Sequence, residues 1–252
     1  MKFKGRMNRK LTFRSMAPNI VTILALSAGL TALKFSLAGQ FEMAAFAVIL
    51  AGVLDTLDGG LARILNSSSK FGAELDSLSD VVSFGVVPAI IVYIWTLNTI
   101  GGFGWAVTLA FVVCQALRLA RFNSKLEEED EPIKSTGFLT GFPAPVGAAM
   151  AILPMALEFE TNTGWFQNPY VVAGYMGLVC FGMVSKIPTY SFKQLFIRKN
   201  QMVPMLLAVG LMAALIIEYG WIMLGVTAIG YFALIPLGIM QYTKLKKNYK
   251  NI

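Results

Sequence analysis

A short polar stretch, residues 55–80, carries the side chains of this chain that are best suited to chemistry. It holds four aspartates, Asp55, Asp58, Asp76 and Asp80, among residues that are mostly apolar. The first two stand three apart and the last two four apart, so each pair shares one face if both halves are helical. A turn between the two helices would bring the pairs together. Such a set of carboxylate oxygens favours hard divalent cations such as Mg²⁺, Mn²⁺ or Ca²⁺.

The charge balance of this stretch also predicts bound cations. An ionised aspartate near the centre of a bilayer costs about 2.5 to 3.5 kcal/mol. The nearest basic residues, Arg63 and Lys70, supply two positive charges against four negative ones. The chain has no histidine, which excludes zinc sites built on histidine and general-base catalysis by histidine. A plainer alternative is that the acids cap helices or line a wet crevice, but capping accounts for only one or two of the four.

The elements that must position these acids are membrane-spanning helices. The chain has 252 residues, of which 56% are hydrophobic and 14% charged, and this composition is typical of multi-span membrane proteins. The net charge of +7 comes from basic residues in short loops, so it indicates membrane topology and not nucleic-acid binding. Cys114 and Cys180 both lie in apolar runs, where we expect them to pack and not to form a disulfide framework.

The pattern of apolar runs predicts an all-α membrane bundle with about eight spans. Nearly all basic residues fall in alternate connections and at the two ends, so both termini are predicted to face the cytoplasm. The acids then lie near the cytoplasmic end of the second and third spans, within reach of a water-soluble reactant and a lipid. The predicted spans are 17–37, 42–65, 73–97, 103–122, 142–158, 168–185, 201–217 and 220–241.

Several residues around the acids have two possible roles. Arg118 and Arg121 share a helical face, and they serve either as topology anchors or as guanidinium groups that hold a carboxylate or a lipid phosphate. Ser83 lies on roughly the face of Asp76, although a hydroxyl bonded to its own helix is the simpler interpretation. Asn19 either caps a helix or contacts a phosphate or base.

The spacing of the polar stretch resembles the signature of the CDP-alcohol phosphotransferase family. The pattern D-x2-D-G-x2-A-R-x8-G-x3-D-x3-D fits residues 55–80 without a departure. The resemblance implies transfer of a phosphatidyl-type group from a CDP-linked lipid to an alcohol, with release of CMP and the use of two divalent ions, Mg²⁺ or Mn²⁺. It makes all four aspartates metal ligands and Asp80 also the general base. It places the CDP moiety against Asn19, Thr22, Gly59, Ala62, Arg63 and Gly72.

Weaker motifs suggest which branch of the family the chain resembles. The stretches PNIVT, SFGVVP, RLARFN and GFPAP are similar to those of bacterial integral-membrane members that use serine as the acceptor. This resemblance would make Ser83, Arg118 and Arg121 contacts for the acceptor or a lipid phosphate. Glycerol-3-phosphate is the alternative acceptor, because it would also need arginines. From a different class, a cation transporter would place its acids near the midplane between two repeats, and no second copy of the acid pattern exists.

The resemblance also divides the chain and suggests its surroundings. The basic residues at 1–16 indicate either an amphipathic segment on an anionic leaflet or a disordered basic tail that only sets topology. We expect a six-helix core at 17–185, and two additional helices with a basic tail at 186–252. The expected partners are CDP-diacylglycerol, serine, the lipid bilayer and a second copy of the chain in a homodimer. The expected location is the cell inner membrane, with the active site facing the cytoplasm and no nucleic acid involved.

Overall fold

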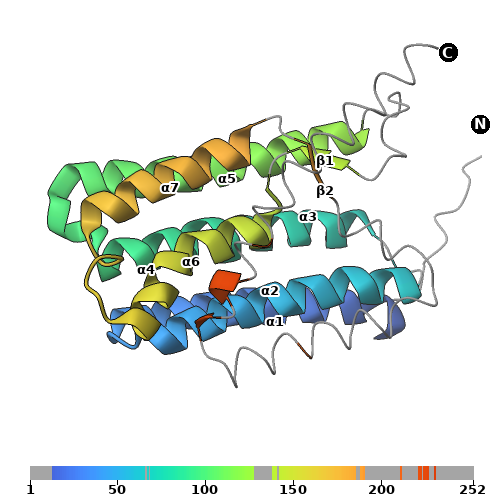
Figure 1. Ribbon diagram of the computed structural model, residues 1–252. Helices are drawn as coiled ribbons and strands as arrows, with labels where there is room; N and C mark the ends of the chain where they lie inside the picture. Colours follow the sequence, from blue (N-terminus) through green and yellow to red (C-terminus); the bar gives the residue numbers. More distant parts are fainter. Residues whose placement is uncertain are drawn as a thin grey trace, which may run out of the picture.

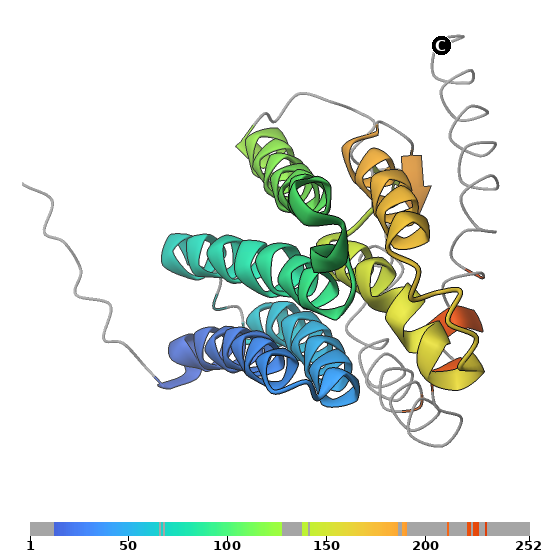
Figure 2. The same cartoon turned by 90° about the vertical axis from the view of Figure 1, so that its left-hand side faces the viewer.

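The protein is a bundle of helices that run side by side (Figure 1). The computed structural model describes residues 13–65, 67, 69–127, 138–140, 142–185 and 188–190, together with 211, 221–222, 224–226 and 230. Seen along the helices, α1 and α2 pack together on one side, α5 and α7 lie on another, and α3–α4 and α6 lie between them (Figure 2). The helices are α1 (Phe13–Leu37), α2 (Phe41–Ile64), α3 (Lys70–Asp80), α4 (Val87–Trp95), α5 (Gly101–Glu127), α6 (Ala144–Thr161) and α7 (Pro169–Val184).

Four segments are long and apolar enough to cross a membrane: Met16–Leu37, Phe41–Ile64, Lys70–Trp95 and Leu97–Ser124. They correspond to the first four predicted spans. The fifth and sixth predicted spans appear as α6, with 18 residues, and α7, an apolar helix with 16. The last two, at 201–217 and 220–241, lie almost wholly outside the described residues. The described part of the chain is therefore a helical bundle with four segments of membrane-spanning length.

The third span is one long helix with a widened turn. A π-helix, η1 (Val81–Val86), joins α3 to α4 directly after Asp80. Pro88 lies in the first turn of α4 and has no backbone N–H to donate to the preceding turn, so a wider turn here is locally tolerated. At the other end of α4, the 3₁₀-helix η2 (Leu97–Ile100) leads into α5. Gly101 has φ of 61° at this corner, a left-handed conformation that glycine adopts readily.

Small residues form the contacts between α1, α2 and the third span. Ala32, Ala44, Ala45 and Ala51 are fully buried. Close backbone approach through small side chains is typical of packing between membrane helices, which gain nothing from burying apolar area away from lipid. Large apolar side chains instead cover the outside of the bundle, among them Leu24, Leu37, Leu178 and Phe181. Soluble proteins bury most of their large apolar side chains, so the exposure of these side chains here agrees with a lipid environment.

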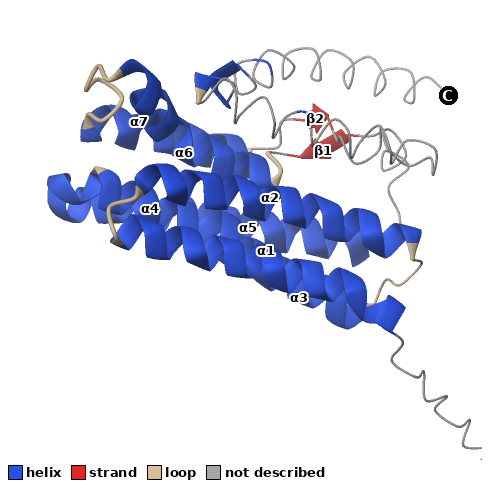
Figure 3. Ribbon diagram, turned by 90° about the horizontal axis from the view of Figure 1, so that it is seen from below, coloured by secondary structure: helices blue, strands red, loops and turns tan. Residues whose placement is uncertain are grey.

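A small β-ribbon is an addition to the predicted all-α fold. β1 (Phe138–Thr140) pairs antiparallel with β2 (Pro188–Tyr190), with Leu139 opposite Thr189 (Figure 3). Both strands lie in connections between the predicted spans, where no regular structure was expected. Strands of three residues are too short for a period-two pattern to reveal them, and it is the meeting of two loops that supplies the backbone hydrogen bonds.

Candidate active site

Three of the four aspartates converge between α2 and α3. Asp55, Asp76 and Asp80 each offer a carboxylate oxygen, and these oxygens all lie within 4.8 Å of one another. We call these three residues the acidic group. All three are partly buried. At 1.5 Å per residue, Asp55 lies about 14 Å from the end of α2, and Asp76 and Asp80 about 9 and 15 Å from the start of α3. The acids therefore meet inside the bundle, toward the end where α2 passes into α3.

The fourth aspartate, Asp58, lies beside the acidic group and is held by α1. Its Oδ2 accepts a hydrogen bond of 2.5 Å from the Thr22 hydroxyl, which is also 3.1 Å from the Pro18 carbonyl oxygen. Thr22 and Asp58 are both only 5% exposed. Asp58 is thus outside the set of mutually close oxygens in the structure, although the sequence analysis grouped it with the other three.

The residues expected to border CDP surround the turn between α2 and α3. Asn19 of α1 lies against Gly72, since a Cβ added at Gly72 would be 2.8 Å from the Asn19 side-chain oxygen. Ser69 caps α3, because its hydroxyl accepts from the Gly72 N–H at 3.0 Å. A Cβ at Gly59 would meet nothing within 4 Å.

The other two members of the expected CDP set are on the last turns of α2. Ala62 is partly buried and Arg63 is exposed. Gly59 has open space at the position of a side chain, while Asn19 and Gly72 form a close contact between α1 and α3. Thr22, the remaining member, contacts Asp58.

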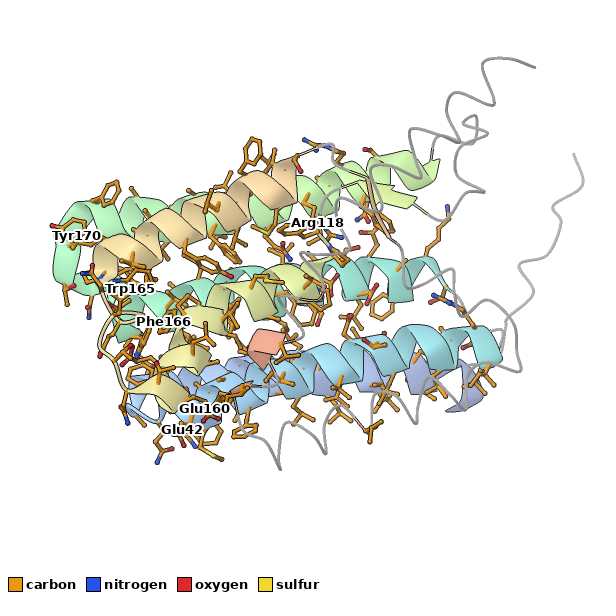
Figure 4. All side chains as sticks on the ribbon, viewed as in Figure 1. Glu42, Arg118, Glu160, Trp165, Phe166 and Tyr170 are labelled. Atoms are coloured by element: carbon orange, nitrogen blue, oxygen red, sulfur yellow. The ribbon has the colours of Figure 1, made fainter. Side chains whose placement is uncertain are left out.

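The two arginines of α5 differ in their surroundings. Arg121 donates from Nη1 to the Val184 carbonyl oxygen at 2.7 Å, which satisfies a carbonyl at the C-terminal end of α7. Arg118, one turn earlier, lies inside the bundle, away from the end that carries Glu42, Glu160, Trp165, Phe166 and Tyr170 (Figure 4). Arg121 therefore has a contact with α7, and Arg118 lies one turn further into the bundle.

α5 runs antiparallel to α3 and η1 in a register that the side chains define. Asn123 donates to the Ser77 hydroxyl at 3.0 Å. Gly85 and Gln115 form the next contact, eight residues further into the bundle along each helix. A Cβ added at Gly85 would lie 3.2 Å from Cγ of Gln115. By the same register Arg118 lies level with Val82, close to the level of Asp80. Arg118 and the acidic group therefore approach the same depth from opposite helices.

Two fully buried polar side chains lie beyond Asp80. Ser83 faces α1, since a Cβ at Gly29 would lie 2.9 Å from its Oγ, and it is 0% exposed. Ser83 therefore packs against α1, and its expected contact with the acceptor stays a prediction. Gln115 of α5 is also 0% exposed, although it was not among the residues predicted to form the site. The available signal was a lone amide within an apolar run, one turn before Arg118.

An apolar cavity lies along α2, and none of the four aspartates is among the residues that line it. It has a volume of about 180 Å³ and follows one face of α2 from Thr56, the residue next to Asp55, toward the opposite end of the helix. Residues of η1 and α6 complete the wall. The lining comprises Val48, Ile49, Gly52, Val53, Thr56, Phe84, Pro145, Ala149 and Leu224.

The donor set fits one or more hard divalent cations. Carboxylate oxygens within 4.8 Å of one another, on two helices and without a histidine or cysteine among them, match the oxygen preference of Mg²⁺ and Mn²⁺. The nearby basic residues Arg63 and Lys70 are exposed. Since clustered carboxylates inside a membrane need neutralisation, the arrangement is chemically suited to a metal site.

Comparison with known proteins agrees with this chemistry. The family model for CDP-alcohol phosphatidyltransferase matches residues 15–235. The CDP-diacylglycerol–serine O-phosphatidyltransferase of Mycobacterium tuberculosis H37Rv is 35% identical over 222 residues, which cover 88% of this chain and 77% of that protein. The proteins of the same name from Helicobacter pylori J99 and Bacillus subtilis 168 are 36% and 33% identical, over 70% of this chain and 73% and 91% of their own lengths. The chain is an enzyme of the CDP-alcohol phosphatidyltransferase family.

Proposed function

We propose that this enzyme transfers the phosphatidyl group of CDP-diacylglycerol to L-serine and releases CMP, with a divalent metal bound at the aspartates. The observation that carries the proposal is the convergence of Asp55, Asp76 and Asp80 within 4.8 Å inside the bundle. The name shared by the relatives supports serine as the acceptor.

Each aspartate has a distinct part in the proposed reaction. Asp55, Asp76 and Asp80 would hold Mg²⁺ or Mn²⁺, in one or two ions, with Asp58 at the side of the group. Bound there, the metal would neutralise the diphosphate and stabilise the departing phosphate of CMP. Asp80 accepts the proton of the serine hydroxyl as the oxygen attacks the phosphorus that carries diacylglycerol. The bond from that phosphorus to the bridging oxygen breaks, and CMP leaves with the bridging oxygen.

The remaining contacts follow from the surroundings of the acids. Asn19, Thr22, Gly59, Ala62, Arg63 and Gly72 would border the CDP moiety at the turn between α2 and α3. The apolar cavity along α2 supports a lipid donor, because its almost wholly apolar lining suits an acyl chain. Arg118 is suited to the carboxylate of serine, because guanidinium and carboxylate pair through two parallel hydrogen bonds.

We place the end where α2 passes into α3 at the cytoplasm. The basic segments of the sequence lie at the corresponding connections, and basic loops stay on the cytoplasmic side. The proposed location is the cell inner membrane, and the four segments of membrane-spanning length support a membrane location. A homodimer remains an expectation.

The decisive test is CMP release by the purified protein in detergent with CDP-diacylglycerol and Mn²⁺. L-serine, glycerol-3-phosphate, inositol and choline are supplied one at a time. We expect release with serine only, loss of release in Asp80→Asn, and near-normal release in Glu74→Gln, a matched control on the exposed face of α3. Release with glycerol-3-phosphate instead of serine would keep the reaction class and replace the acceptor. Equal rates in Asp80→Asn and wild type would contradict the role of Asp80.

A further inference from the structure

The side chain of Gln115 is a buried amide without hydrogen-bond partners among the described residues. It is 0% exposed, and neither Nε2 nor Oε1 is paired there. Buried polar atoms of native proteins are almost always paired, so each exception calls for an explanation. An apolar side chain of the same shape would avoid this cost, which indicates that the amide serves a purpose other than packing.

Gln115 sits where three other elements meet α5. A Cβ at Gly85 of η1 would lie 3.2 Å from its Cγ, and a Cβ at Gly147 of α6 would lie 3.4 Å from its Oε1. The same Cβ at Gly147 would be 2.8 Å from Sδ of Met183 in α7. Glycines at both positions thus leave room for the amide between the helices.

The register between α5 and the third span fixes the depth of Gln115 relative to the acids. Gln115 is level with Gly85, five residues beyond Asp80, or about 7 Å along the helix. Arg118 shares the α5 face with Gln115, since residues three apart are neighbours on a helix. The three side chains therefore follow one another in depth. Asp80 lies nearest the end where α2 passes into α3, Arg118 lies deeper, and Gln115 lies deepest.

The distance of about 7 Å along the helix between the levels of Asp80 and Gln115 suits a small hydroxy amino acid. Its hydroxyl and ammonium groups are roughly 3 Å apart, and two hydrogen bonds of about 2.8 Å extend its reach to about 8 to 9 Å. An ammonium group carries only donors, and arginine offers only donors, so Arg118 cannot bind it. The amide oxygen of Gln115 is a neutral acceptor at the correct depth.

We propose that Gln115 is a recognition residue for the acceptor, with its Oε1 accepting a hydrogen bond from the acceptor's ammonium group while Arg118 pairs with the carboxylate. This inference rests on the proposed function, because it assumes an amino-acid acceptor. It adds a selectivity rule: the enzyme prefers an acceptor with an amino group next to the carboxylate over the same molecule without it.

The test compares L-serine with 3-hydroxypropionate, which is serine without the amino group. Both acceptors are supplied to wild type, Gln115→Met and Gln115→Glu in the CMP-release assay, with CDP-diacylglycerol and Mn²⁺ held constant. We expect wild type to prefer serine by about tenfold or more in kcat/KM, the factor expected for a hydrogen bond to a charged group. Gln115→Met should lose about tenfold for serine, keep its value for 3-hydroxypropionate, and keep its KM for CDP-diacylglycerol.

Gln115→Glu keeps an acceptor oxygen at the same place, so it should retain the preference for serine; this variant decides the matter if Gln115→Met does not fold. Equal losses for both acceptors in Gln115→Met, loss of the preference in folded Gln115→Glu, or a wild type that uses both acceptors equally would overturn the inference. Failure of the proposed function has a different signature, since wild type would then release no CMP with serine.

Discussion

Replacing Thr22 with valine tests whether α1 holds Asp58 in place. Valine matches threonine in shape but lacks the hydroxyl that donates to Asp58 Oδ2 at 2.5 Å. Both residues are 5% exposed, so water cannot easily replace the lost donor. A hydrogen bond to a charged group contributes about 1.5 to 3 kcal/mol. For a chain of this size, that loss corresponds to a fall in melting temperature of roughly 3 to 12 °C.

The assay is thermal unfolding in detergent with EDTA present, so that a bound cation does not replace the lost donor. Thr22→Ser is the matched control, because it keeps the hydroxyl and removes only a methyl group. We expect Thr22→Ser to melt within a few degrees of wild type, and Thr22→Val to melt clearly lower. If the two variants melt together, the hydrogen bond does not hold Asp58, and the link between α1 and α2 must come from packing alone.

Two further predictions concern the metal site and the packing of α1. Mn²⁺ at 100 times its dissociation constant should stabilise wild type by about 2.7 kcal/mol in thermal unfolding, and this gain should disappear in Asp76→Asn; an equal gain in both would place the ion elsewhere. Gly29→Ala should lower the free energy of unfolding by about 1 to 3 kcal/mol, because the added Cβ would lie 3.2 Å from Cα of Ser83. Gly177→Ala is the control and should change stability little, since an added Cβ would meet nothing within 4 Å. Similar melting temperatures for the two variants would show that α1 can shift away from Ser83.

The helical arrangement near the acids could be predicted well from the sequence. Runs of about 20 apolar residues locate the first four spans, because a bilayer imposes that length. The spacing of the aspartates predicts convergence of two helix faces, and the structure brings Asp55, Asp76 and Asp80 together. The roles assigned to these residues, and the division of the chain at 17–185, stay predictions.

The details beyond Asp80 could not be predicted, because they depend on tertiary contacts. The π-helix Val81–Val86 and the packing of Ser83 on Gly29 of α1 are two such details. The hydrogen bond between Thr22 and Asp58 joins residues 36 apart in the sequence, and no local sequence pattern predicts it. Likewise, the contact of Arg121 with Val184 involves a carbonyl, which the identity of residue 184 does not reveal.

The acidic group is encoded within one helical hairpin, residues 55–80, and this has a consequence for biosynthesis. The hairpin is complete before the ribosome reaches Gln115 and Arg118, which follow about 2 to 7 s later at 5 to 20 residues per second. Contacts close in sequence form with a smaller loss of chain entropy than distant ones. The acidic group can therefore assemble first during translation, and the two residues proposed to recognise the acceptor join it when α5 enters the membrane.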